Sequence, residues 1–140
     1  MTNNNCAYCM GGKLYEPFGI KICDLENSVV VLFKEQSHKG RVIVAAKDHV
    51  GDMAYLTDEQ RAGFFGDMAK VANVIHELFN PDKINYAAFG DTGGHAHFHL
   101  VPKYEDGFEW GSVFEMNPAK VYLTDAEYTE IIELIKNKLI

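Results

Sequence analysis

The most constraining feature of this sequence is the strict alternation of histidine with apolar residues in the run HAHFHLV, from His95 to Val101. On a β-strand, side chains two residues apart project from the same face, roughly 6.5 to 7 Å apart along the strand. The period of two therefore predicts a strand over residues 96–101, with imidazoles on one face and an apolar face packed on a core. Three imidazoles on one face can surround a phosphate group or a metal ion.

Two capping boxes predict where helices begin. Thr57 is followed three residues later by Gln60, and Thr124 is followed by Glu127 in the same way. The first helix is long and ends near Pro81, and the second runs to the end of the chain. Each carries an apolar stripe at spacings of three and four, formed by Phe64, Met68, Val71, Ile75 and Leu78 and by Tyr128, Ile131, Ile132, Ile135 and Leu139.

Short β-branched runs predict four further strands, over residues 21–24, 28–33, 41–46 and 84–89. The expected class is α+β: an antiparallel sheet of about five strands, one long central helix and a C-terminal helix. A chain of 140 residues with 47% hydrophobic content is typical of one globular unit. Residues 1–140 are therefore expected to form a single domain.

The composition excludes several classes of partner. A net charge of −7 opposes binding to nucleic acid polymers, which depends on clustered basic residues. No run approaches the roughly 18 apolar residues of a membrane span, and the start MTNNN lacks the basic and apolar regions of a signal peptide. We expect a cytoplasmic protein whose ligand is small and phosphorylated, because such a ligand needs only a few local donors.

The middle histidine of the alternating run, His97, is the best placed nucleophile. An imidazole offers a lone pair at neutral pH when its other nitrogen donates to a carbonyl, and its attack on phosphorus would give a labile phosphoramidate. Donors to the phosphate oxygens would be His99 and the backbone N–H groups of Gly93 and Gly94. Asn85, on the preceding strand, is expected to bind the ligand or the histidines, although an ordinary strand-edge role fits it equally well.

Other readings of the histidines remain open. A solvated polar strand face explains one isolated histidine more readily than three in alternation. A catalytic metal site that uses these histidines directly is a second alternative, but such sites usually take ligands from more than one strand. His38, in a predicted turn, and His76, off the apolar stripe, are expected to be solvated.

Three cysteines suggest a metal site more than a disulfide framework. Cys6 and Cys9 have the C-x-x-C spacing that suits zinc, which then needs two further ligands. Free surface thiols are the alternative, whereas a redox pair is disfavoured because no predicted strand precedes the motif. Cys23 lies in an apolar strand and is expected to be a small buried side chain.

The segments NYAAFG (85–90) and HAHFHLVPKY (95–104) resemble the histidine triad (HIT) family of nucleotide hydrolases and transferases. The run KGRVIVAAKDH (39–49) is similar to the Gly-His-x-Leu-Val-x-Pro-Lys-x-His segment of that family. The resemblance implies His97 as the nucleophile, with His95 and His99 as its triad partners. It also implies a homodimer that cleaves at the α-phosphate of nucleoside phosphoramidates, acyl adenylates or dinucleoside polyphosphates.

The resemblance extends to zinc. Some HIT proteins carry an N-terminal C-x-x-C whose zinc is completed by the His of the Pro-Lys-x-His segment and by the first triad histidine. By that likeness the ligands here are Cys6, Cys9, His49 and His95. Closed four-coordination would make this zinc structural, because no position stays open for water.

Three positions depart from the family pattern. Residues 90–94 (GDTGG) stand where many members carry Gly-Gln-Ser or Gly-Gln-Thr, and the Ser or Thr that would assist the leaving group is missing from its usual place. The Asp that commonly holds the ribose would fall near Phe33, and Arg41 replaces the His after Gly40. A noncatalytic nucleotide-binding or interaction protein on the same scaffold is therefore the alternative function.

Overall fold

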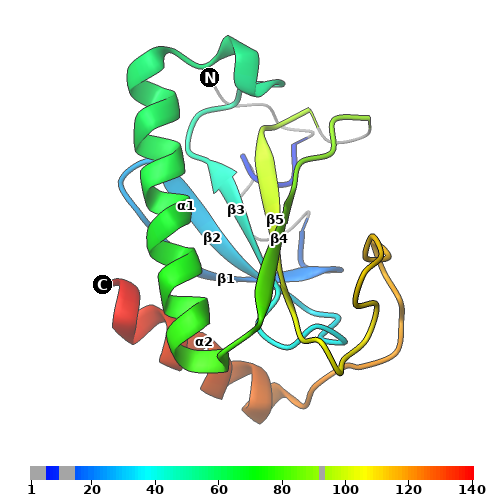
Figure 1. The fold of residues 1–140 in the computed structure, drawn as a ribbon. Coiled ribbons are helices and arrows are strands. Elements are labelled where there is room, and N and C mark those ends of the chain that lie inside the picture. Colours follow the sequence, from blue (N-terminus) through cyan, green and yellow to red (C-terminus); the bar gives the residue numbers. More distant parts are fainter. Residues whose placement is uncertain (1–5, 10–14, 92–93) are drawn as a thin grey trace.

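The computed structural model describes residues 6–9, 15–91 and 94–140. Its centre is a five-stranded antiparallel sheet of order β1-β2-β3-β5-β4 (Figure 1). The strands are β1 (Gly19–Asp24), β2 (Ser28–Phe33), β3 (Val42–Ala46), β4 (Lys83–Ala87) and β5 (His97–Lys103). The helices are α1 (Asp58–Phe79) and α2 (Asp125–Leu139), with a short 3-10 turn η1 (Met53–Tyr55) before α1. The predicted α+β arrangement is confirmed.

Both predicted capping boxes are present. The side chain of Thr57 accepts from the backbone N–H of Gln60, and that of Thr124 accepts from Glu127, with the reciprocal bond formed in each case. Helix α1 ends at Asn80, whose φ of 46° is left-handed, directly before Pro81. The helix ends therefore follow from local sequence signals.

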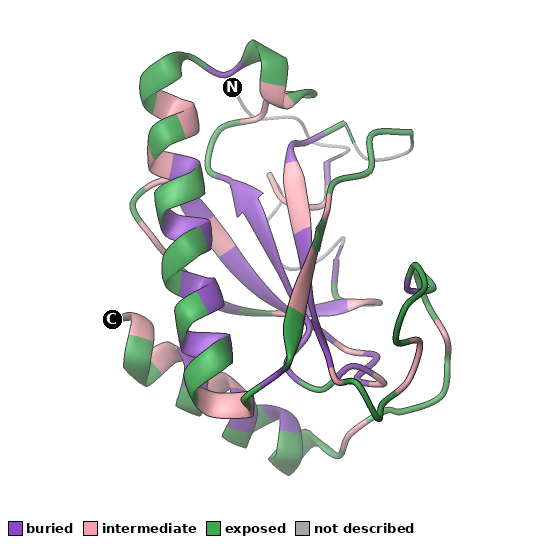
Figure 2. Ribbon diagram, viewed as in Figure 1, coloured by how far each residue is buried: buried purple, intermediate pink, exposed green. Residues whose placement is uncertain are grey.

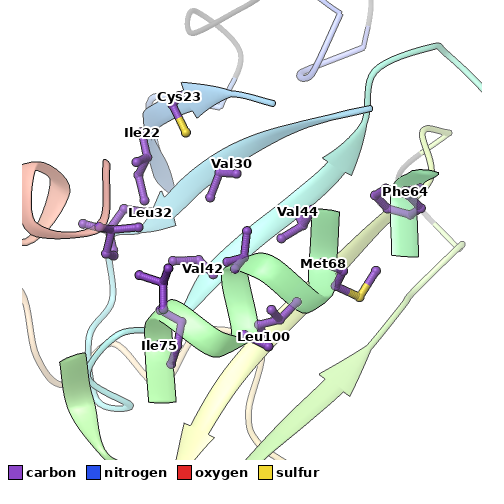
Figure 3. Close-up of a cluster of buried hydrophobic side chains, with 14 of the residues drawn as sticks. Ile22, Cys23, Val30, Leu32, Val42, Val44, Phe64, Met68, Ile75 and Leu100 are labelled. Atoms are coloured by element: carbon purple, nitrogen blue, oxygen red, sulfur yellow. The ribbon is translucent and has the colours of Figure 1, made fainter. Parts of the chain in front are cut away.

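Helices α1 and α2 cover one face of the sheet, where the main core lies (Figures 1 and 2). Alternate strand residues point into this core, and α1 meets them with its predicted stripe, although Leu78 is only partly buried. Each fully buried aliphatic side chain stabilises the fold by roughly 1.5 to 3 kcal/mol. Figure 3 shows the packing of Val30, Leu32, Val42, Val44 and Leu100 against Phe64, Met68 and Ile75.

Within the described ranges no helix lies on the opposite face of the sheet, which carries a second, smaller cluster. Its buried members are Tyr15, Val31, Phe33 and Ile43, and Tyr8 is among the partly buried residues that pack against it. The histidines of β5 lie on this same face, because Ile43 pairs with His99 in the register of β3 and β5. The sheet thus separates a structural face from one available for chemistry.

An irregular segment, residues 104–123, folds back along the histidine face and is held by buried charges. The ammonium of Lys103 donates to the carbonyls of Glu109 and Ser112 at 2.6 and 2.7 Å. The carboxylate of Glu35 accepts from the backbone N–H groups of Lys120 and Val121 at 2.7 and 3.1 Å. These contacts fix a loop that carries no secondary structure of its own.

The environment of His38 and several strand bounds differ from the prediction: β1 begins at Gly19, β3 begins at Val42, and β5 covers His97–Lys103. His38 is 4% exposed, not solvated, because the 104–123 segment covers it and brings a Glu109 carboxylate oxygen within 2.7 Å of its Nε2; His76 is exposed as predicted. Strand β4 ends at Ala87, short of residue 89. Phe89 leaves the strand because its ring packs against other rings, those of His99 and Phe114, each 6.1 Å away between centroids.

No helix in the described part of the chain combines the length and apolar character that crossing a bilayer requires.

Candidate active site and metal centre

The alternating histidines divide between two neighbouring sites. His97 and His99 lie on β5 with ring centroids 5.6 Å apart, whereas His95 precedes the strand and is 2% exposed. Between them, Phe98 points to the other face and meets Phe64 and Phe65 at centroid distances of 6.0 and 5.7 Å. The predicted split between a histidine face and an apolar face is confirmed.

The geometry of His97 leaves one ring nitrogen ready to react. Its Nδ1 lies 2.7 Å from the backbone carbonyl oxygen of His95. A carbonyl can only accept, so Nδ1 carries a proton, and in the neutral form of the ring Nε2 keeps its lone pair. This half-buried ring therefore has the tautomer that a nucleophile requires.

Two cavities meet at His97. One, of about 340 Å³, is largely aromatic and is lined by Ala7, Tyr8, Phe18, Phe33, Ile43, Phe89, His97, His99, Met116 and Asn117. None of these described lining residues is acidic, so an anionic ligand meets no repulsive side chain in this wall. The other, of about 270 Å³, is lined by Gly51, Asp52, Met53, Ala88, Phe89, Gly90, His95, Ala96 and His97. His97 thus lies where an apolar group and a second group could be bound on either side.

The ring of His99 has the opposite tautomer. Its Nδ1 lies 3.2 Å from Nη2 of Arg41, and a guanidinium can only donate, so Nδ1 accepts and Nε2 carries the proton. Burial, followed by the charge of Arg41 and the proximity of His97, lowers the pKa of His99 to about 3. His99 is therefore neutral at physiological pH.

Arg41 is fully buried and stands between two aromatic rings. Its guanidinium carbon lies 3.9 Å from the ring centroid of Phe33 and 4.7 Å from that of Phe114. It also donates to the backbone carbonyls of Glu115 and Met116 at 3.2 and 3.0 Å. Burial lowers the pKa of Arg41 to about 10, which still leaves it cationic at neutral pH. From the sequence, Arg41 was identified only as a departure from the family pattern. Its position at the start of the apolar run RVIVAA could have indicated a buried charge.

A compact set of four donors lies beside the histidine pair. Cys6, Cys9, His49 and His95 place their ligand atoms within 4.8 Å of one another. The Nδ1 atoms of His49 and His95 are 3.3 Å apart. Sγ of Cys6 is 3.3 Å from Nδ1 of His95, and Sγ of Cys9 is 3.3 Å from His49 and 3.6 Å from His95. The four residues predicted as zinc ligands therefore converge.

These separations fit a tetrahedral zinc ion. Zn–N and Zn–S bonds of about 2.05 and 2.3 Å give edges of about 3.3 Å between two nitrogens and about 3.6 Å between nitrogen and sulfur. His95 is also prepared as a ligand: its Nε2 lies 2.6 Å from the carbonyl of Ala46 and donates to it, so Nδ1 offers its lone pair to the cluster. Burial lowers the pKa of His95, which favours the neutral form that binds metal.

The C-x-x-C loop also builds a wall of the aromatic cavity. The ring of Tyr8, between the two cysteines, lies 5.5 Å from that of His95 and 5.0 Å from that of His97. Burial raises the pKa of the Tyr8 hydroxyl above its ordinary value. The donor cluster and the histidine pocket therefore share one short segment.

Of the predicted substrate-binding residues, the two that the structure describes line neither of the cavities that meet at His97. Asn85 is on the histidine side of β4 but pairs with Val101, one step beyond His99, and it lines a neighbouring groove of about 770 Å³ with Trp110 and Phe114. Gly94 is exposed, and Gly93 lies outside the described residues. Their roles stay predictions. This groove adjoins the histidine site through Phe114, whose ring is 6.1 Å from that of His99.

Known structures with this fold include other histidine triad proteins. One from Bradyrhizobium japonicum superposes with a TM-score of 0.83 at 19% identity, covering 91% of this chain and 96% of that chain. A Zn-bound histidine triad family protein from Mycobacterium smegmatis gives a TM-score of 0.68 at 23% identity, covering 96% and 93%. The predicted HIT-like fold is therefore confirmed.

Relatives in sequence lead to the same family. Protein hit of Bacillus subtilis (strain 168) is 27% identical over 118 residues, 79% of each chain. Adenosine 5'-monophosphoramidase hnt1 of Schizosaccharomyces pombe is 27% identical over 134 residues, 92% of this chain and 99% of that protein. The HIT domain profile matches residues 19–106, more than half of the chain. The predicted relationship is thus confirmed, and the chain belongs to the HIT domain family.

Proposed function

We propose that this protein hydrolyses or transfers small nucleotides by attack of His97 on the α-phosphate, with a covalent nucleotidyl-histidine as intermediate. The observation that carries the proposal is the 2.7 Å contact between Nδ1 of His97 and the carbonyl of His95. It leaves the Nε2 lone pair of a neutral imidazole at the junction of two cavities.

The reaction consists of two displacements at phosphorus. First, Nε2 of His97 forms a bond to the α-phosphorus, and the bond from phosphorus to the leaving group breaks. The leaving group takes the electron pair and a proton from water. Second, water or another acceptor attacks the phosphorus and releases a proton to the solvent, the N–P bond breaks, and the ring recovers its lone pair as the nucleoside monophosphate or its ester is released.

The cavities support a nucleoside phosphate as substrate class. The wall formed by Tyr8, Phe18, Phe33 and Phe89 suits a flat apolar group such as a base. The cavity on the other side of His97, which includes Gly51 and Gly90, has room for a small leaving group. The S. pombe relative named as an adenosine 5'-monophosphoramidase supports adenosine 5'-phosphoramidate as the first compound to test.

The test is a substrate panel of adenosine 5'-phosphoramidate, an acyl adenylate and a dinucleoside polyphosphate, quenched and analysed by intact-protein mass spectrometry. We expect an adenylyl adduct in the wild type and none in His97→Ala, whose turnover falls by roughly 1000-fold or more. His76→Ala, an exposed histidine of α1, is the matched control and should retain both adduct and turnover. Undiminished turnover in His97→Ala would refute the proposal.

A noncatalytic nucleotide-binding protein is the alternative, favoured by the departure of the GDTGG segment from the Gly-Gln-Ser or Gly-Gln-Thr of many family members. It predicts that the wild type binds AMP by calorimetry but consumes no member of the panel. The two outcomes are therefore distinguished by the same set of compounds.

We further propose that Cys6, Cys9, His49 and His95 hold one structural Zn²⁺. The four donors fit a closed tetrahedron, and such an ion would tie the N-terminal segment to the strand that carries the histidines.

A homodimer is the proposed assembly. Strand β4 forms the edge of the sheet, and an unpaired edge is a template for another strand. Beside it, Tyr86 on β4 and Phe65 on α1 are 49% and 42% exposed, large values for aromatic side chains. Light scattering should give the mass of two chains, and Tyr86→Lys should shift it toward one. Tyr55→Lys, at an exposed tyrosine of η1, should leave the mass unchanged.

A further inference from the structure

The buried contact between Arg41 and His99 is the feature that the proposed mechanism leaves unused. Arg41 is 0% exposed and therefore does not touch a ligand in the cavity. Its partner on β5 is Nδ1 of His99, 3.2 Å from Nη2. Arg41 can therefore act on the reaction only through the residues it contacts: His99, the ring of Phe33 in the cavity wall, or the loop that Arg41 also holds.

The contact fixes which nitrogen of His99 faces the cavity as a donor. Since a guanidinium never accepts a hydrogen bond, Nδ1 of His99 must stay unprotonated and Nε2 must carry the hydrogen. Nε2 has no hydrogen-bond partner among the described residues, and His99 lines the aromatic cavity. Its N–H is thus available to a ligand oxygen in the cavity that His97 and His99 both line.

We propose that Arg41 is a positioning residue that holds His99 as a neutral Nε2–H donor to the phosphate oxygens attacked through His97. The proposal rests on the proposed function for the identity of the ligand, but not for the state of the ring. Two adjacent imidazoles then have opposite tasks: His97 offers a lone pair because a carbonyl orients it, and His99 offers a proton because a cation orients it.

The surroundings of the pair explain why this state persists over a wide pH range. The groups facing His99 are Arg41, His97 and the aromatic rings of Phe33, Phe89 and Phe114. None of these is an acid that would stabilise an imidazolium. The acids that act on Arg41, Glu35 and Glu109, favour its cationic form and so favour the donor that faces Nδ1. A histidine at position 41 could change its protonation in this range, whereas an arginine does not.

The first test reads the ring state without any assay of activity. Long-range ¹H–¹⁵N correlation spectra of wild-type protein labelled in its histidine rings assign the protonated nitrogen of each ring. We expect His99 to remain protonated at Nε2 alone from pH 5 to 8, and its Nε2 resonance to shift when AMP is added. A proton on Nδ1, an imidazolium in this range, or no response of Nε2 to bound AMP overturns the proposal.

The second test separates the tautomer from the loop. Arg41→Met should lower kcat by roughly 10- to 100-fold with a smaller change in KM, and it should alter the His99 tautomer; Arg41→Lys should recover part of both. Lys103→Met is the matched control, because Lys103 anchors the same segment through Glu109 and Ser112. It should leave the His99 tautomer unchanged. If Arg41→Met also leaves it unchanged, the role of Arg41 is only structural.

A double-mutant cycle completes the design. In a His99→Gln background, Arg41→Met should lower kcat by less than about twofold further, because its effect passes through the missing ring. A full additional loss contradicts the proposal. If no compound of the panel is turned over at all, the proposed function fails while the NMR arm still decides the ring state.

Discussion

The backbone carbonyl oxygen of His95 accepts a hydrogen bond from Nδ1 of His97 at 2.7 Å, while the ring of the same His95 belongs to the four-donor cluster. One residue therefore connects the predicted metal ligands to the predicted nucleophile. A substitution that disturbs the cluster is therefore expected to displace His95 and, through its carbonyl, to change the orientation of the His97 ring.

Loss of the cluster should lower both stability and turnover. Cys6→Ser and Cys9→Ser are expected to remove about one Zn²⁺ per chain, measured by elemental analysis, and to lower Tm by roughly 10 °C or more. Cys23→Ala is the control, since Cys23 is a buried thiol of the core away from the donor set. Its zinc content should match that of the wild type, and a wild type that contains no zinc as purified would refute the metal assignment.

The wall contributed by Tyr8 should determine substrate affinity more than the rate of chemistry. Replacing this ring, 5.0 Å from that of His97, in Tyr8→Ala is expected to raise KM roughly tenfold, because an aromatic contact to the bound nucleoside is lost. Tyr8→Phe keeps the ring and should behave as wild type in steady-state kinetics. An equal rise in KM for both variants would assign the effect to the hydroxyl instead.

Acid should destabilise the fold partly through His99. Its pKa is about 3 in the folded protein, against an ordinary value of about 6.5, so the unfolded chain binds this proton more readily. The contribution is complete above pH 6.5 and is lost as the pH falls toward 3. In urea titrations between pH 4 and 6, the free energy of unfolding of His99→Gln should depend on pH less steeply, by up to about 1.4 kcal/mol per unit. His76→Gln should keep the wild-type slope, and an unchanged slope in His99→Gln would contradict the assignment.

The turn that delivers Arg41 depends on Gly40. Its φ of 93° is one that side-chain-bearing residues rarely adopt, and an added Cβ would lie 2.7 Å from the ring of Phe79. Gly40→Ala should therefore lower the free energy of unfolding by about 1 to 3 kcal/mol. Gly66→Ala, at an open position of α1, should instead raise it by about 0.5 to 1 kcal/mol. Equal changes in the free energy of unfolding for the two substitutions, measured by chemical denaturation, would show that the turn does not require glycine at position 40.

The sequence predicted those features that local rules determine. Capping boxes at Thr57 and Thr124 fixed the helix starts, and the period of two around His97 fixed which face of β5 meets the core. The four cluster residues were predicted from the family resemblance and not from their spacing in the sequence. Residues as far apart as Cys6 and His95, 89 positions in the sequence, contribute to the cluster, and no local pattern connects them.

The features that the sequence missed depend on contacts between distant segments. His38 is buried beneath the segment that contains Glu109, whose carboxylate contacts its ring. Arg41 contacts His99, 58 residues away in the sequence, and the backbone carbonyls of Glu115 and Met116, 74 and 75 residues away. No periodicity or propensity encodes such contacts. Segment 104–123 was therefore the least predictable part of the chain, yet it contributes Met116 and Asn117 to the cavity wall.

The stacking of Arg41 on Phe33 has an evolutionary consequence. By the resemblance to the HIT family, Arg41 replaces a His and an Asp would fall near Phe33; here the side chains of Arg41 and Phe33 touch each other, 3.9 Å from guanidinium carbon to ring centroid. An Asp at position 33 would pull the guanidinium into an ion pair and away from His99, whereas a His at position 41 is too short to fill the space between Phe33 and Phe114. Neither single replacement is expected to keep the present geometry, so the side chains at positions 33 and 41 should depend on each other. Homologues with an aromatic residue at position 33 are expected to carry arginine at position 41, so the two positions should covary in an alignment of the family.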